Sequence, residues 1–303
     1  MLNKVLLIYE ASPSDWTINE WKDNGLTVAI QYKKINKLMR AIRKLWILCN
    51  LPCQEIWYGN WKQQVKEADI IIVHILTLNY ALPKYLNQLN PNARIIAWYW
   101  NTVDRTILPE KIQGQCELWT FDPEDARIYE MKFNHQYYFK SLLRFAVKTV
   151  IKWDVYFAGY DHGRGRDIKK AYDLCKEYGL KTYFQVVKPQ SKCIPEEIVS
   201  NKVSYSEICH NISQSKAILE IVKEGQTGAT LRVMEAVYFQ KKLITNNTHV
   251  KEEEFYNENN IFVLNERPGD EILSFMQVDM VPYENEIIEK YDVRQWIETF
   301  IVN

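Results

Sequence analysis

The segment between Ser215 and Asn246 combines residue types that could bind a phosphate group. It predicts a buried strand at Ala217–Val222, followed by a glycine turn made of Gly225, Gln226, Thr227 and Gly228. An amphipathic helix is expected to begin near Thr227, and a second strand is expected at Leu243–Thr245. Such a turn directs several backbone N–H groups to the positive end of the helix dipole. A phosphate or pyrophosphate can bind there without a side-chain cation.

Arg232 and Glu235 lie three residues apart, on one face of the expected helix and near its start. An arginine in this place could pair with a phosphate, and a glutamate could accept hydrogen bonds from ribose hydroxyls. The same two residues could equally form a solvated ion pair. Both interpretations remain open on spacing alone.

A second glycine-rich loop follows the strand expected at Asp154–Gly159 and leads into a helix near Asp167. Gly159, Gly163 and Gly165 would let the backbone approach a ligand, and Arg164 and Arg166 offer planar, charged donors, although a charged surface loop fits the same letters. Lys188 follows the next strand and would face the same site, unless Pro189 only forms a simple turn.

These segments resemble the donor-binding elements of GT-B glycosyltransferases, in particular CgeB-like enzymes and the sugar transferases of capsule and lipopolysaccharide-core gene clusters. Those families carry R-x-x-E-A on the helix and G/K-K-x-x-I-T-x-N on the next strand. The matching residues are Gly225, Gln226, Thr227, Gly228, Arg232, Glu235, Ala236, Lys242, Ile244, Thr245 and Asn246. Their second domain opens with a pattern similar to F-x-G-x(3)-G-R, and WYWNTVDR is similar to a segment of their first domain.

The resemblance implies that the glycine turn, Gly159, Arg166 and Arg232 hold a diphosphate, and that Glu235 holds the ribose. It favours Arg166, which abuts the helix, over Arg164. Many retaining GT-B families place a second glutamate eight positions before the ribose-binding one, where this chain has Thr227. The resemblance therefore does not extend to the stereochemistry of transfer.

Short apolar runs alternate with amphipathic stretches along the whole chain, which predicts α/β architecture with doubly wound parallel sheets. We expect strands at Lys4–Tyr9, Leu26–Gln31, Asp69–Ile75, Arg94–Trp100, Glu117–Phe121, Asp154–Gly159, Thr182–Val187, Ala217–Val222, Leu243–Thr245 and Ile261–Val263. The chain length suits two Rossmann-like domains facing a cleft, an acceptor-side domain at 1–148 and a nucleotide-sugar domain at 149–303. One last helix, about Tyr283–Phe300, resembles the GT-B helix that crosses back to the first domain.

Glycosyl transfer by inversion needs a base for the acceptor hydroxyl, and strand ends of the first domain supply three candidates. They are Asp104, Glu10 and His74. Each has a structural alternative: Asp104 could cap a turn, Glu10 could be a solvated surface residue, and His74 could be a core residue. Asp122 precedes Pro123 and two acidic residues, which predicts a helix N-cap and a structural role.

No D-x-D motif occurs in the chain, and the six cysteines lack CxxC spacing. In GT-A enzymes, a D-x-D motif holds the metal that stabilises the leaving diphosphate. We therefore expect no metal and no cofactor other than a nucleotide-diphosphate sugar as donor substrate. Helix N-termini and arginines would stabilise the leaving group.

Equal numbers of basic and acidic side chains, 38 of each, argue against a general nucleic-acid binder. We expect a cytoplasmic protein, because no signal peptide or membrane-length apolar run is visible. The segment from Lys33 to Cys49 predicts a basic amphipathic helix, which could lie on a membrane surface or pack on its own sheet.

The leading hypothesis is a metal-independent glycosyltransferase that acts on a surface polysaccharide or lipid-linked glycan acceptor. A sugar-nucleotide epimerase of the same fold and a non-catalytic protein of envelope or spore assembly are the alternatives. An NAD dehydrogenase is disfavoured, because the first strand leads into YEASPSDW and not into a glycine fingerprint.

Overall fold

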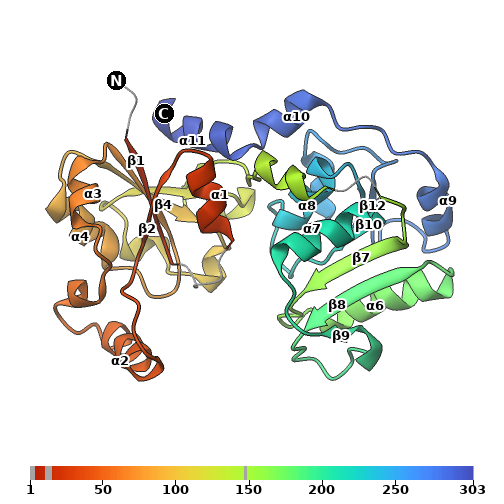
Figure 1. The fold of residues 1–303 in the computed structure, drawn as a ribbon, viewed down its shortest axis with the longest axis horizontal. Helices are drawn as coiled ribbons and strands as arrows, with labels where there is room; N and C mark the ends of the chain where they lie inside the picture. Colours follow the sequence, from red (N-terminus) through yellow and green to blue (C-terminus); the bar gives the residue numbers. More distant parts are fainter. Residues whose placement is uncertain (1–3, 11–15, 147–148, 303) are drawn as a thin grey trace. The chain divides into compact units, whose positions relative to one another are not determined.

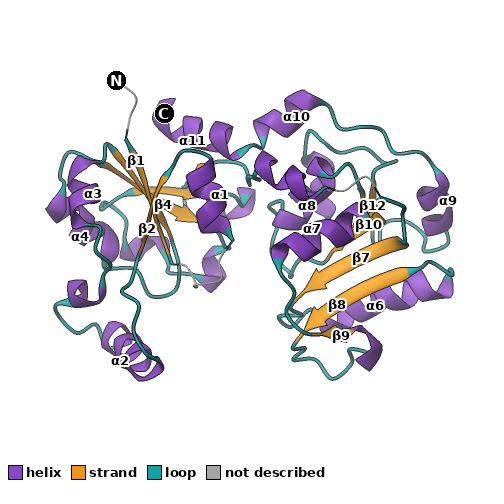
Figure 2. Ribbon diagram, in the orientation of Figure 1, coloured by secondary structure: helices purple, strands orange, loops and turns teal. Residues whose placement is uncertain are grey.

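The computed structural model describes residues 4–10, 16–146 and 149–302 (Figure 1). The chain divides into two compact units, Met1–His135 with Ile297–Asn303, and Gln136–Trp296. Each unit is built on one parallel sheet with helices packed against it (Figure 2). No helix in the described part of the chain has the length and apolar character needed to cross a membrane.

The sheet of the first unit has six parallel strands in the order β2-β1-β3-β4-β5-β6. Their bounds are β1 Val5–Tyr9, β2 Thr27–Ile30, β3 Ile70–His74, β4 Arg94–Tyr99, β5 Glu117–Thr120 and β6 Lys132–Phe133. Helices cover both faces of such a sheet, so its central strands are apolar along their length, as β3 is. The strand order reverses between β1 and β3.

The helices of the first unit are short and connect successive strands. They are α1 Thr17–Asp23, α2 Lys37–Leu48, η1 Gln54–Trp57, α3 Lys62–Glu67, α4 Leu82–Leu89, η2 Val103–Arg105, η3 Pro109–Lys111 and α5 Pro123–Ile128. The Asp122 carboxylate accepts hydrogen bonds from the backbone N–H groups of Glu124 and Asp125, at 3.0 and 3.1 Å. The predicted N-cap of α5 is thereby confirmed.

The second sheet is also six-stranded and parallel, in the order β12-β11-β10-β7-β8-β9. Its strands are β7 Trp153–Gly159, β8 Thr182–Val187, β9 Val199–Ser200, β10 Ser215–Glu220, β11 Lys242–Thr245 and β12 Ile261–Val263. This is the strand order of a Rossmann sheet, with the direction of winding changing between β7 and β10.

Alternate strand residues of the second sheet pack on opposite faces. The helical segments are η4 Lys140–Phe145, α6 Gly165–Glu177, η5 Glu196–Ile198, α7 Tyr205–Ser213, α8 Leu231–Tyr238, η6 Thr248–Glu252, α9 Glu271–Gln277, α10 Asn285–Lys290 and α11 Val293–Val302. Val155, Phe157 and Leu219 belong to an apolar core with residues of α6 and α9. Helices α7 and α8 pack on the same sheet and cover β10.

The predicted fold class is confirmed, since both halves are doubly wound parallel α/β sheets. The two-residue strands β6 and β9 are additional to the expected set. The division between the units follows His135, earlier than the boundary expected at 148.

The single helix expected near the end of the chain is wrong in one respect, because it is two helices, α10 and α11. The break between the two helices occurs where Tyr138 forms backbone hydrogen bonds with Tyr291 and Val293. The N–H of Tyr138 donates to the carbonyl of Tyr291, and the N–H of Val293 donates to that of Tyr138, both at 2.9 Å. This local strand-like pairing replaces helical hydrogen bonds.

The end of α11 packs in the first unit. The Phe300 carbonyl accepts a hydrogen bond from Nη1 of Arg94 at 2.7 Å. The Phe300 ring makes edge-to-face contacts with Trp98 and Trp119, at centroid distances of 6.1 and 4.9 Å.

Candidate functional site

Two loops meet where the strand order of the second sheet reverses. One follows β7 and leads to α6, and the other follows β10 and leads to α8. In open α/β sheets, ligands bind beyond the carboxyl ends of the strands at such a switch point. Both glycine loops singled out in the sequence lie here.

The loop after β10 is fixed at both ends by a buried carboxylate. Glu220, the last residue of β10, accepts a hydrogen bond from the hydroxyl of Thr245 at 2.6 Å and another from the hydroxyl of Thr230. Burial raises the pKa of Glu220, although these hydroxyls oppose the shift. The Thr230 oxygen also accepts the N–H of Arg232 at 3.1 Å and caps α8.

Helix α8 therefore begins at Leu231, and the expectation of a start near Thr227 is wrong. Thr227 lies in the preceding turn, where its carbonyl accepts a hydrogen bond from the Asn247 side chain at 3.1 Å. Gly225 has a φ of +82°, in the left-handed region that favours glycine. Residues 223–227 are exposed or half-buried, whereas Gly228 is buried.

Arg232 and Glu235 form an enclosed ion pair. The Glu235 side chain is 0% exposed, and its carboxylate accepts hydrogen bonds from Arg232 and, at 2.7 Å, from the Tyr205 hydroxyl. Nη2 of Arg232 donates to the carbonyl of Ala158 on β7 at 2.8 Å. Burial would lower the pKa of Arg232, but the adjacent carboxylate raises it, so the guanidinium stays charged.

In this geometry Glu235 is not placed to contact a ribose, and Arg232 is mostly engaged within the protein and has little surface left for a phosphate. Glu235 presents no open oxygen to a ribose in the folded chain. Arg232 keeps a small exposed fraction, 19% of its side chain, and ties α8 to the neighbouring strand β7. A ribose contact by Glu235 stays a prediction, and it would require Tyr205 or Arg232 to release the carboxylate.

Arg164, in the loop after β7, is bound to the backbone through all three guanidinium nitrogens. Nε donates to the Asp161 carbonyl at 3.0 Å, Nη2 to the Tyr160 carbonyl at 2.7 Å, and Nη1 to the Ile221 carbonyl. The last bond crosses the switch point and joins the two loops. Arg164 therefore has a structural task in this arrangement.

The same loop is held close to the one after β8. The buried Asp161 carboxylate accepts hydrogen bonds from the N–H groups of Gln190 and Ser191, at 3.0 and 2.8 Å. A Cβ atom at Gly165 would lie 2.3 Å from that of Ser191, so only glycine fits there. Gly159, by contrast, has room for a side chain, with only ordinary contact to Phe157.

Arg166, in the first turn of α6, and Lys188, in the loop after β8, are exposed cations. Among the described residues neither side chain makes an ion pair or a hydrogen bond. Lys188 has a φ of +45°, at a tight turn directly after β8. Of the cations predicted to bind phosphate, these two are the exposed ones.

The three candidate bases lie in the first unit. Glu10 is exposed at the end of β1, and His74 ends the neighbouring strand β3. Asp104 is exposed in η2, accepts a hydrogen bond from the Thr102 hydroxyl, and lies 3.7 Å from Nε of Arg105. Glu10 and His74 thus flank the switch point of the first sheet, whereas Asp104 follows β4.

His74 is enclosed by aromatic rings. Trp100 stacks on it at a centroid distance of 5.2 Å, and Tyr9 and Trp21 approach edge-on at 4.9 and 6.0 Å. Burial lowers its pKa to about 3, so the imidazole is neutral at physiological pH. Its Nε2 has no hydrogen-bond partner within the described ranges.

Sequence reasoning missed Asp125 as a possible acid or base. Its carboxylate accepts the N–H of Val103 at 2.8 Å. Burial, assisted by the nearby Asp122 and Asp104 carboxylates, raises its pKa to about 6 despite that hydrogen bond. Perturbed carboxyl groups of this kind are common at functional sites. The helix-capping pattern around Asp122 gave no signal of it.

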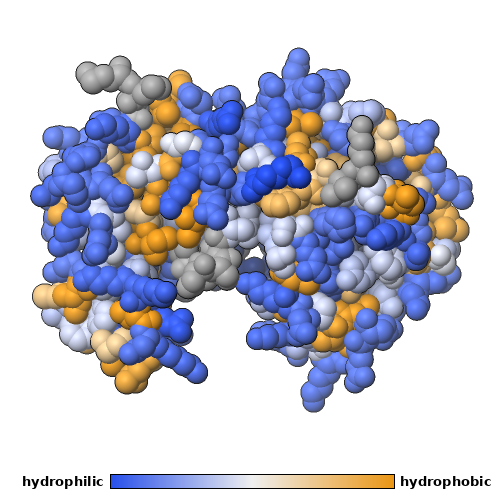
Figure 3. Space-filling view, viewed as in Figure 1, coloured by the Kyte–Doolittle hydropathy of each residue, from blue (hydrophilic) through white to orange (hydrophobic). Residues whose placement is uncertain are grey.

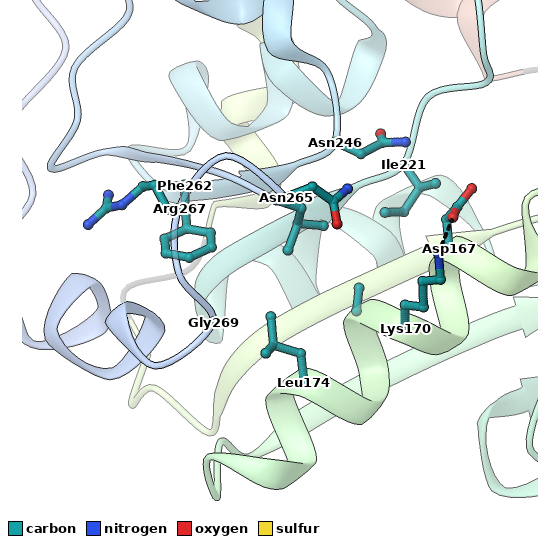
Figure 4. A pocket seen from close by; sticks show the side chains of 11 residues that line it. Asp167, Lys170, Leu174, Ile221, Asn246, Phe262, Asn265, Arg267 and Gly269 are labelled. Atoms are coloured by element: carbon teal, nitrogen blue, oxygen red, sulfur yellow. Dashed lines mark ion pairs between the residues drawn. The ribbon is translucent and has the colours of Figure 1, made fainter.

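A cavity of about 280 Å³ opens on the α6 side of the second sheet (Figure 4). Its lining residues are Asp167, Lys170, Ala171, Leu174, Ile221, Asn246, Phe262, Leu264, Asn265, Arg267 and Gly269. None of the residues predicted to bind the donor is among them. Asn246, at its edge, is occupied by reciprocal hydrogen bonds with the Val222 backbone, at 2.7 and 3.1 Å.

The described residues contain no group of three or more His, Cys, Asp or Glu side chains placed to hold a metal ion. No protein-family model and no curated protein matches the chain by sequence.

Solved structures do match it in fold. The lipopolysaccharide outer core galactosyltransferase WaaB has a TM-score of 0.53 at 14% identity, over 98% of both chains. The DNA-modifying enzyme β-glucosyltransferase has a TM-score of 0.59 at 14% identity, also over 98% of both chains. The α,α-trehalose 6-phosphate synthase of Burkholderia multivorans has 0.61 at 9% identity, over 100% of this chain and 98% of its own. The chain thus has the two-domain Rossmann-like fold of GT-B glycosyltransferases.

Proposed function

We propose that this protein is a glycosyltransferase that transfers a sugar from a nucleotide-diphosphate donor to a glycan or lipid-linked acceptor. One observation carries the proposal. The exposed turn at 223–227, followed by the capped start of α8, lies at the switch point of the second sheet. Two exposed cations without a partner among the described residues follow the neighbouring strands, Arg166 at the start of α6 after β7 and Lys188 directly after β8. The fold shared with known GT-B transferases supports it.

The donor diphosphate would bind at this switch point. Its negative charge is complemented by Arg166, Lys188 and the positive end of the α8 dipole, which Thr230 caps. Gly225, Gln226 and Thr227 supply backbone close to the diphosphate. In this proposal the leaving group needs no metal, because fixed cations and backbone N–H groups stabilise its charge.

Arg232, Glu235 and Arg164 would act mainly by fixing the two loops. Arg232 and Arg164 each bind a backbone carbonyl across the switch point, on Ala158 and Ile221 respectively. Preorganised loops bind a ligand without the cost of ordering them. Arg232, with part of its side chain exposed, is the member of the three that could also meet a phosphate.

In the transfer step, the acceptor hydroxyl oxygen forms a bond to the anomeric carbon as the bond from that carbon to the phosphate oxygen breaks. The electron pair of the broken bond leaves with the nucleoside diphosphate. A base takes the hydroxyl proton if the reaction inverts. Asp104, Glu10 and His74 remain our candidates, and Asp125 joins them because its pKa is near 6.

We propose that the acceptor is a surface polysaccharide or a lipid-linked glycan and not a nucleic acid. Support comes from the charge balance, with 38 basic and 38 acidic residues. The fold does not decide between the two acceptor classes, because it is shared with a lipopolysaccharide-core transferase and with a DNA-modifying glucosyltransferase. Placement of the protein at the cytoplasmic face of the membrane would bring it to a lipid-linked acceptor.

Calorimetry with UDP, GDP, CDP and dTDP tests the donor site directly. We expect one nucleoside diphosphate to bind, and binding to weaken at least tenfold in Arg166→Ala, since a charge-assisted contact to phosphate is lost. Arg294→Ala, an exposed arginine on α11, serves as the matched control and should bind as wild type does. Equal binding by both variants would remove Arg166 from the site, and the absence of binding by wild type would contradict the proposal.

Product analysis separates transfer from the alternatives. A transferase releases nucleoside diphosphate from a nucleotide sugar in the presence of acceptor, or slowly to water. An epimerase yields an isomeric nucleotide sugar with no nucleoside diphosphate, and a non-catalytic binding protein yields neither.

A further inference from the structure

Helix α2 presents an apolar stripe to solvent. Its side chains at Leu38, Leu45 and Leu48 are 69, 62 and 58% exposed, and Ile42 between them is also exposed. Residues 38, 42, 45 and 49 lie along one side of the helix at helical spacing. The surface over α2 shows a corresponding gathering of apolar side chains (Figure 3).

The opposite side of α2 holds the helix to its unit. Ile47 is buried, and Nε1 of Trp46 donates to the Pro52 carbonyl at 2.8 Å. The Tyr80 hydroxyl donates to the Ile47 carbonyl at 2.6 Å, and the Arg43 guanidinium lies 4.1 Å from the centre of the Tyr32 ring. The packed side is thus distinct from the exposed stripe, although the sequence pattern merged the two.

The charges around the stripe have one sign. Between Lys33 and Gln54 the sequence has six basic residues and no acidic one, in a chain whose formal net charge is +0. Lys37, Arg40 and Lys44 are exposed along one flank of the stripe. A second copy of this chain would bring like charges together, whereas an anionic surface complements them.

We propose that α2 docks this protein on an anionic lipid bilayer. Leu38, Ile42 and Leu45 would enter the boundary between headgroups and acyl chains. Lys37, Arg40 and Lys44 would pair with lipid phosphates. The inference rests on α2 itself and does not depend on sugar transfer, so its test can fail while the proposed function stands.

Vesicle sedimentation tests the docking in two steps. We expect wild type to sediment with vesicles containing phosphatidylglycerol and to remain in solution with phosphatidylcholine alone. The triple variant Leu38→Ser/Ile42→Ser/Leu45→Ser should lose sedimentation, while Leu108→Ser/Ile128→Ser, which changes exposed apolar residues elsewhere in the unit, should retain it.

A second triple variant, Lys37→Ala/Arg40→Ala/Lys44→Ala, tests the contribution of the basic residues to vesicle binding. Each basic residue near an anionic surface contributes about fivefold to the binding constant, so the loss should be about 100-fold. Lys66→Ala/Lys84→Ala/Lys111→Ala, three exposed lysines away from α2, should bind as wild type does. Inorganic phosphate at matched ionic strength should not release the protein, since the apolar contact is to lipid.

Two outcomes would overturn the proposal. One is sedimentation of the apolar triple variant at the wild-type level. The other is a wild-type dimer in size-exclusion chromatography that this variant converts to a monomer, with no vesicle binding by either, which would make the stripe a contact between copies of the chain.

Discussion

Thr230 donates its hydroxyl hydrogen to the buried carboxylate of Glu220, and the same hydroxyl oxygen accepts the N–H of Arg232 in the first turn of α8. One side chain therefore fixes the end of β10 and the beginning of the helix. The exposed part of the turn lies between these two fixed points.

Thr230→Ala should destabilise the second unit. The change removes a helix N-cap, worth about 1 kcal/mol, and the hydroxyl donor to a buried carboxylate, which costs about 1–3 kcal/mol more. Chemical denaturation followed by circular dichroism measures the loss. Thr230→Ser keeps the hydroxyl and should restore the midpoint, and Thr248→Ala, at an exposed threonine, should leave it unchanged. A wild-type midpoint for Thr230→Ala would contradict the double role.

Glu235→Gln should be strongly destabilising, by about 3 kcal/mol, because it leaves the Arg232 charge enclosed without a counter-charge. The exposed pair of Arg127 and Glu124 has the same i,i+3 spacing, so Glu124→Gln is a matched control and should change little. Replacing both Arg232 and Glu235 by Met should cost less than the sum of the single changes. If Glu235→Gln were as stable as wild type, the carboxylate would be accessible to solvent, and a contact between Glu235 and the ribose would again be favoured.

Arg164→Ala and Arg166→Ala should have opposite signatures. Arg164 binds three backbone carbonyls, so its loss should lower the melting temperature. Arg166 is exposed and unpaired among the described residues, so its loss should leave the melting temperature unchanged and reduce the rise that a bound nucleoside diphosphate produces. Thermal denaturation with and without nucleotide gives both readings. The reverse pattern would exchange the roles of the two residues.

His74 should make stability fall as the solution is acidified. Its pKa is about 3 in the folded chain and about 6.5 when unfolded, so below pH 6.5 the unfolded state binds a proton that the folded state does not. The stabilisation is complete above pH 6.5 and decreases progressively toward pH 3. Denaturant titrations of wild type and His74→Phe between pH 8 and 4 measure it as a difference. A difference independent of pH would show that His74 is accessible to protons when folded.

The sequence patterns located the main strands because each is an apolar run bounded by turn residues, as β3 and β8 show. Strands β6 and β9 have two residues each, and periodicity cannot be measured over so short a run. The Asp122 cap was predictable because its partners are two and three residues away.

The start of α8 and the roles of the site residues depend on contacts between distant parts of the chain, which local sequence patterns do not reveal. Thr227 and Thr230 are both plausible caps, and Glu220, on the preceding strand, selects Thr230. Arg164 and Arg166 differ in role because the Ile221 carbonyl, 57 residues along the chain, accepts from the first. Burial of Glu235 depends on Tyr205, from another helix.

The hydrogen bond from Arg94 to Phe300 spans 206 residues and completes the first unit with the last turn of the chain. During synthesis, Trp98 and Trp119 therefore emerge long before the ring that covers their edges. A fragment ending at His135 would therefore lack a packing element of its own unit.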